Sequence, residues 1–169
     1  MPKINTHLHA ALRLREKKKV KNLEAFYLGN VYPDCWNCSE EQHCLYHYKK
    51  DISALCDLEK FMETEEMNDF NLGYLFHLWF DNYILTVDTK DISKYDCMIC
   101  DMAVILPVIQ ELKGQEFEGK EGQAMQKICS LESEPVPLYL VSNYKREQYV
   151  KILDKAAELF VEQYKGVLE

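Results

Sequence analysis

The residues of this sequence that are best suited to chemistry are histidines and aspartates in its first half. All five histidines occur within the first 77 residues: His7, His9, His43, His47 and His77. His77 and Asp81 are four residues apart, so on a helix their side chains share one face. Imidazole and carboxylate groups together are ligands for Zn²⁺, and also for Mn²⁺, Fe²⁺ or Ni²⁺. The pair therefore indicates either a metal site or a simple His–Asp hydrogen bond inside a core.

The stretch around this pair reads as a buried helix. From Phe70 to Val87, after the capping residues Asn68 and Asp69, apolar or aromatic side chains point in nearly every direction. A helix that is apolar all round is normally buried. Burying an ionisable pair costs several kcal/mol unless something compensates it, and a bound cation is one compensation. We expect an all-α bundle built around this central helix, at about residues 69–87.

Another candidate ligand lies near the start of the chain. Thr6 can cap a helix that runs from His7 to about Lys18. His7 falls on the apolar face of this helix, whereas His9 projects from another face. The spacing therefore favours His7 for an inward role.

A stiff loop holds the next candidate, Asp34. A short helix over residues 22–28 is expected to close at Gly29 and Asn30. Pro33 then restricts the residue before it and takes the chain out of the helix. Asp34 follows at once, either as a ligand or as an ordinary turn residue.

Two further histidines share the following helix. Ser39 and Gln42 have capping-box spacing, and His43 and His47 lie one turn apart beyond them. The spacing allows either of these histidines, or both, to be a ligand. The candidate ligands come from four separate elements, so only tertiary packing can bring them together.

The second half of the chain reads as helices without obvious chemistry. We expect a helix over residues 96–113 with a kink at Pro107, a surface loop over 115–123 and a last helix over about 143–166. There is no internal repeat and no low-complexity linker. We therefore expect residues 1–169 to form one domain, a metal-binding helical domain.

Composition excludes several classes of partner. The net charge of −8 argues against stable binding to nucleic acid or to anionic membranes. No segment reaches about 18 apolar residues without a charge, and the N-terminus lacks the apolar core of a signal peptide. We expect a cytoplasmic protein that does not insert into membranes, with its seven cysteines reduced.

The cysteines offer a rival metal site. Cys35 and Cys38 form one C-x-x-C pair, and Cys97 and Cys100 form another. The second pair falls on an expected apolar helix, where thiols are more easily read as small core residues. A structural Cys₄ zinc site is therefore the less favoured interpretation.

Four blocks of the sequence together resemble the zinc-dependent phospholipase C family. They are Thr6-His7, Gly29-Asn30-Val31-Tyr32-Pro33-Asp34, His43 and Gly73-Tyr74-Leu75-Phe76-His77-Leu78-Trp79-Phe80-Asp81. The resemblance covers roughly residues 3 to 90. It implies the all-helical fold that this family shares with a single-strand-specific zinc nuclease, here in a bacterial, cytoplasmic member.

The resemblance also implies a ligand set. Asp34, His43, His77 and Asp81 would surround one metal ion, with His43 preferred to His47 by the resemblance although helix geometry permits either. His7 together with Asp81 would serve a second ion. Asp34 would be a ligand, the general base, or both. The chain lacks the family's N-terminal tryptophan and has no histidine after His77, so we expect one or two zinc ions rather than three.

The function that follows is hydrolysis of a small phosphate ester, a phosphodiester or a phosphomonoester. A bound zinc ion lowers the pKa of water from about 15.7 to about 7 and so supplies hydroxide at neutral pH. The alternative is a non-catalytic helical protein in which the same residues hold a structural ion or bind a partner.

Overall fold

The chain folds into helices joined by turns and loops. A computed structural model describes residues 3–35, 39–131 and 140–168, and within these ranges there is no β-strand. The elements in chain order are α1 (Ile4–Lys17), α2 (Leu23–Val31), η1 (Tyr32–Asp34), α3 (Glu40–Tyr46), α4 (Leu58–Thr64), α5 (Asp69–Ile84), α6 (Lys94–Leu112), α7 (Gly119–Leu131), α8 (Asn143–Gln163) and α9 (Lys165–Leu168). The prediction of an all-α fold is confirmed.

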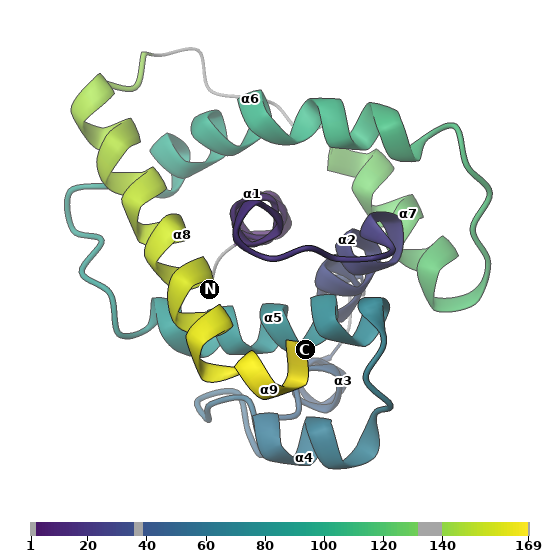
Figure 1. The fold of residues 1–169 in the computed structure, drawn as a ribbon. Helices are drawn as coiled ribbons and strands as arrows, with labels where there is room; N and C mark the ends of the chain where they lie inside the picture. The colour runs from purple at the N-terminus through teal and green to yellow at the C-terminus, as the bar shows by residue number, and fades with distance from the viewer. Residues whose placement is uncertain (1–2, 36–38, 132–139, 169) are drawn as a thin grey trace.

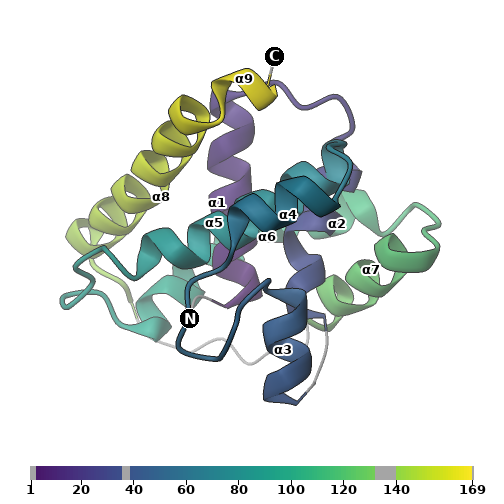
Figure 2. The same ribbon diagram turned by 90° about the horizontal axis from the view of Figure 1, so that it is seen from below.

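Helix α1 lies in the middle of the molecule. Seen along its axis, it is surrounded by α2, α5, α6 and α8 (Figure 1), and it contacts each of these helices. Turned by 90°, the molecule shows α7 and α8 on opposite sides of α1 (Figure 2). Every residue from Ile4 to Ala11 is buried. The expectation that the helix at 69–87 is the centre is therefore corrected, because α5 forms one side of the ring around α1. The hydrophobic pattern of the sequence does not predict that α1 is central, because several of its buried residues are polar: Asn5, Thr6, His7 and His9.

Helix α5 nevertheless has the buried character that its sequence predicts. The side chain of Asn68 accepts a hydrogen bond from the backbone N–H of Asn71, which makes Asn68 the N-cap. The helix is buried without interruption from Gly73 to Asp81. It ends at Ile84, three residues earlier than expected, where the chain leaves the core and Leu85 is exposed.

The backbones of α2 and α5 touch at two glycines. A Cβ atom on Gly29 would lie 1.8 Å from the carbonyl oxygen of Phe70, and one on Gly73 would lie 2.0 Å from that of Phe26. Both positions therefore require glycine. Gly29 and Asn30 were expected to end the second helix, but α2 continues to Val31. Gly29 serves the contact between the two helices instead of ending one of them.

Helix α1 is tied to α6 and α8 by a buried carboxylate. Thr6 is not the N-cap that we expected, because α1 begins at Ile4 and the Thr6 hydroxyl donates to Asp101 of α6 at 2.8 Å. His9 Nδ1 lies 2.9 Å from the same carboxylate, and the Tyr149 hydroxyl of α8 donates to it at 2.6 Å. Asp101 is completely buried. This network fixes the rotation of α1, and with it the direction of the other α1 side chains.

The second half of the chain follows the predictions with shifted ends. Helix α6 contains Pro107 as expected, and α8 begins after the N-cap Ser142 but ends at Gln163, three residues before Gly166. The expected surface loop at 115–123 is partly wrong, because α7 begins at Gly119. Three residues at helical spacing explain why α7 forms, since they are buried in the core: Ala124, Ile128 and Leu131. In the part of the chain that the structure describes, no helix combines the length and apolar content needed to cross a membrane.

Candidate metal centre

Four elements bring five side chains to one buried place. His7 comes from α1, Asp34 from the end of η1, His47 from the C-cap of α3, and His77 and Asp81 from α5. Two groups have potential ligand atoms within 4.8 Å of one another: His7, His77 and Asp81, and Asp34, His47 and His77. The structure thus brings together four of the residues expected at the site, and their binding to a metal stays a prediction.

The backbone fixes the orientation of His77. Its Nδ1 lies 2.7 Å from the carbonyl oxygen of Asn30, which can only accept a hydrogen bond. Nδ1 therefore carries the proton, and Nε2 keeps its lone pair. Burial, the first cause, together with the nearby charge of His7 lowers the pKa of His77 to about 3. At neutral pH this imidazole is neutral and has the tautomer of a metal ligand that binds through Nε2.

His47 is held in the same way. Its Nδ1 lies 3.0 Å from the carbonyl oxygen of His43, so its Nε2 also has a free lone pair in the neutral ring. The two Nε2 atoms of His47 and His77 are 3.2 Å apart. Two lone pairs repel each other at this distance unless a proton or a cation lies between them. A cation that accepts both lone pairs would remove this repulsion.

Two carboxylates complete a cage around these nitrogens. Asp34 Oδ1 lies 3.2 Å from His47 Nε2 and 3.9 Å from His77 Nε2. Asp81 Oδ2 lies 3.7 Å and 3.9 Å from the same two atoms. Tetrahedral zinc with bonds of about 2.0–2.1 Å has ligand atoms about 3.3–3.4 Å apart. The distances from each oxygen to the two Nε2 atoms are close to this spacing, so these four residues are candidates for the ligands of one ion.

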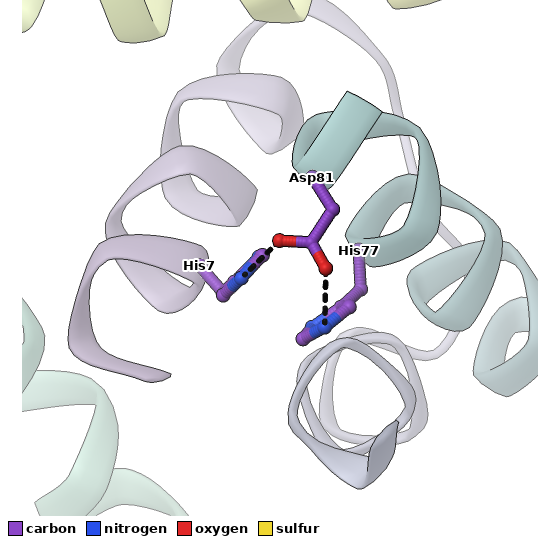
Figure 3. A group of neighbouring side chains, drawn as sticks. All are labelled: His7, His77 and Asp81. Atoms are coloured by element: carbon purple, nitrogen blue, oxygen red, sulfur yellow. Dashed lines mark ion pairs between the residues drawn. The ribbon is translucent and has the colours of Figure 1, made fainter. Parts of the chain in front are cut away.

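Asp81 also faces His7 (Figure 3). Its two carboxylate oxygens are turned toward different rings, Oδ1 toward His7 and Oδ2 toward His77. The distance from His7 Nε2 to Asp81 Oδ1 is 3.4 Å, and the His7 ring stacks on His77 with centroids 3.7 Å apart. Within the described residues, neither ring nitrogen of His7 and neither carboxylate oxygen of Asp81 has a hydrogen-bond partner. Such unsatisfied buried groups require an explanation, and a second cation between His7 and Asp81 would provide it.

The electrostatics of the site favour a positive ion. Burial alone would raise the pKa of Asp34 and of Asp81, but the neighbouring histidines outweigh it and lower both, that of Asp34 to about 2. At neutral pH both carboxylates are ionised while His77 is neutral. Two negative charges in a core of low polarity are costly unless a cation compensates them.

His43 lies beside the cage rather than in it. Its ring stacks on His47 with centroids 3.9 Å apart, and it belongs to neither of the two ligand groups. The structure thus gives His47 the place for which His43 was preferred. The reason is that α3 ends at Tyr46, so His47 leaves the helical path and turns inward, whereas His43 stays on the helix. Burial lowers the pKa of His43 and its Nε2 is buried, but its role as a ligand stays a prediction.

The cysteines that the structure describes do not form a site. Cys38 lies outside the described residues, and none of the others belongs to a potential ligand group in the described ranges. Burial raises the pKa of Cys35 and of Cys97 to about 12. Both thiols are therefore protonated at neutral pH in the metal-free protein.

Comparison of the chain with protein-family models, with curated proteins and with solved structures gives no match. The resemblance to the phospholipase C family therefore depends only on the residues that carry it. The chemistry of the site has to be inferred from its geometry.

Proposed function

We propose that this protein is a metal-dependent hydrolase of phosphate esters, with zinc as the preferred metal. One observation carries the proposal: the Nε2 atoms of His47 and His77 face each other at 3.2 Å, while both Nδ1 atoms are turned to backbone carbonyls. This arrangement is unfavourable without a cation and favourable with one. The mixed nitrogen and oxygen donors suit Zn²⁺, and they also accommodate Mn²⁺, Fe²⁺ or Ni²⁺.

The ligands divide between two ions. Asp34, His47, His77 and Asp81 would hold the first, and His7 would share Asp81 with a second. A bound zinc ion lowers the pKa of water to about 7 and polarises a phosphoryl oxygen, which is the chemistry that phosphate-ester hydrolysis needs. Since Asp81 presents its two oxygens to different histidines, it is suited to bridging two ions.

Asp34 is the residue best placed to meet water and substrate. Its side chain is 18% exposed, whereas the other four candidate ligands are at most 4% exposed. Its pKa of about 2 keeps it ionised over the whole physiological range. An ionised carboxylate at the open side can orient the attacking water and accept its proton. Because a carboxyl with so low a pKa retains a proton poorly, orientation is its larger role.

The resemblance and the geometry point to the same chemistry. His7, Asp34, His77 and Asp81 were expected from the resemblance, and the structure brings them together, which supports a phospholipase C-like hydrolase. The net charge of −8 favours a small phosphate ester over a nucleic acid as substrate. We therefore propose a phosphodiesterase or phosphomonoesterase that acts on small molecules.

A structural ion is the second candidate function, and burial favours it. His7, His47, His77 and Asp81 are at most 4% exposed, and structural zinc sites are closed by protein ligands. In this case the ion would join α1, α3 and α5 without catalysing a reaction.

Metal content and turnover test both candidates. Wild type, His77→Ala and Asp81→Ala would be loaded with zinc and dialysed, and their bound metal would be measured by mass spectrometry, with the exposed Asp88→Ala as the control. We expect one or two ions in wild type and the control, and a loss of at least one ion in the other two variants. Unchanged metal in both variants would remove the basis of the proposal. Zinc-dependent turnover of a phosphomonoester or phosphodiester supports the hydrolase, and binding without turnover of any ester supports the structural ion.

A further inference from the structure

One cleft of the molecule reaches a candidate ligand. It has a volume of about 230 Å³ and lies between the start of α1, the end of η1 and the last turns of α7. Its lining consists of Lys3, Ile4, Asn5, Asp34, Lys127 and Leu131. Since Asp34 is the exposed member of the candidate metal centre, this cleft is a route by which a substrate can approach the centre.

A positive charge on α7 faces the cleft. Lys127 lines it together with Asp34. Lys127 makes no ion pair with any residue that the structure describes. A lysine beside a buried anionic centre and without an acidic partner is available to bind an anion.

A polar group lies on the α1 side of the same cleft. Asn5 is 2% exposed, and its Oδ1 is buried without a hydrogen-bond partner among the described residues. A buried acceptor of this kind costs free energy unless a donor reaches it. The hydroxyl of a substrate, or a protonated phosphate oxygen, would supply that donor.

We propose that Lys127 binds the phosphate group of a phosphate monoester in this cleft, next to Asp34. This inference rests on the proposed function and adds the substrate class and a substrate-binding residue to it. A monoester phosphate carries a charge of about −1.5 to −2 at neutral pH, more than a diester, and the ionised Asp34 repels it. The ammonium of Lys127 offsets this repulsion, and lysine binds phosphate as a point charge. The cleft is smaller than the pockets of about 300–1,000 Å³ that hold drug-sized ligands, so it suits a phosphate with a small ester group.

Inorganic phosphate is the probe for this site. Its affinity for the zinc-loaded full-length protein would be measured by calorimetry for wild type, Lys127→Met, Lys127→Arg and Lys120→Met. Lys120 is the matched control, because it lies on the same helix but over the ring of Tyr32 in a different cleft. We expect the Kd for phosphate to rise about tenfold or more in Lys127→Met, which corresponds to the loss of one charge-assisted hydrogen bond. Lys127→Arg restores most of the affinity, and Lys120→Met leaves it unchanged.

Zinc content and kinetics separate this inference from the proposed function. All four proteins should bind the same amount of zinc, because Lys127 is not a ligand. With a small phosphate monoester as substrate, Lys127→Met should raise KM about tenfold while kcat changes by less than about threefold. Equal phosphate affinity in wild type and Lys127→Met overturns the inference, and so does a zinc-loaded wild type that binds no phosphate. The proposed function is judged independently, by the zinc content and turnover of wild type.

Discussion

Replacing His47 by alanine should impair zinc binding, whereas replacing His43 should not. The two histidines are one turn apart, so helix geometry alone leaves them equivalent, and in the structure their rings stack on each other. In the structure, His47 Nε2 lies 3.2–3.7 Å from ligand atoms of Asp34, His77 and Asp81. His43 belongs to no ligand group. The two variants therefore remove rings of equal size with different consequences.

The size of the effect follows from the number of ligands. Zinc binding to a four-ligand structural site is worth about 10–16 kcal/mol, so one ligand of four contributes roughly 3–4 kcal/mol. This corresponds to an increase of about 10²–10³-fold in the Kd for zinc in His47→Ala. His43→Ala loses ring stacking and some packing, and its Kd should change less than about tenfold.

Competition with a chromophoric chelator measures these affinities, and thermal unfolding provides an independent measurement. A metal at 100 times its Kd stabilises the fold by about 2.7 kcal/mol, and for a chain of this size each kcal/mol raises Tm by about 2–4 °C. Zinc should therefore raise the Tm of wild type and His43→Ala by about 5–10 °C. At the same zinc concentration the rise should be absent or much smaller in His47→Ala. If His43→Ala loses zinc and His47→Ala keeps it, the assignment made from the geometry is wrong and the one made from the resemblance is right.

Two further predictions concern packing and pH. Gly73→Ala should lower the free energy of unfolding, measured in urea, by at least about 3 kcal/mol, because its Cβ would lie 2.0 Å from the carbonyl oxygen of Phe26. Gly114 has open space around it, so Gly114→Ala should be nearly neutral. Equal stability of the two variants would contradict the close helix contact. In the metal-free protein, the pKa of His77 falls from 6.5 to about 3 on folding, so between these values the unfolded chain binds the extra proton and stability falls as pH falls. The pKa of Asp34 falls from 3.8 to about 2 on folding, so stability falls further as the pH is lowered between these two values. Tm measured from pH 7 to 4 should decline, less steeply in His77→Gln, and a flat profile in wild type would show that His77 is not buried as a neutral ring.

The features that the sequence predicts well are those determined by neighbouring residues. Helix α5 has a polar cap at Asn68 and apolar residues on all sides, and both signals are local. His77 and Asp81 share a face because four residues make about one turn. The capping box at Ser39 and the N-cap at Ser142 are local in the same way, and the structure has both.

The features that the sequence does not predict depend on contacts between distant segments. Gly29 has the usual signal of a helix end, but its role is set by Phe70, 41 positions later in the chain. Thr6 looks like an N-cap, but its hydroxyl is used by Asp101 of α6. His47 differs from His43 only because α3 ends between them, and Tyr48 then adopts a φ of 51° that no sequence signal indicated. In each case a local pattern allows two outcomes, and tertiary packing selects one.

The contact between α2 and α5 at Gly73 also bears on whether the His77–Asp81 pair is a metal site or a hydrogen bond inside the core. Because α2 touches α5 at Gly73, the Asn30 carbonyl oxygen comes within 2.7 Å of His77 Nδ1 and accepts a hydrogen bond from its N–H. Without this carbonyl, the proton could sit on Nε2 and satisfy Asp81 as an ordinary core hydrogen bond. With it, the Nε2 lone pair of His77 points at the carboxylate and at His47 Nε2, where only a positive charge is stabilising. The close approach of two helix backbones thus supports the proposal that this helical His-x-x-x-Asp pair holds a cation.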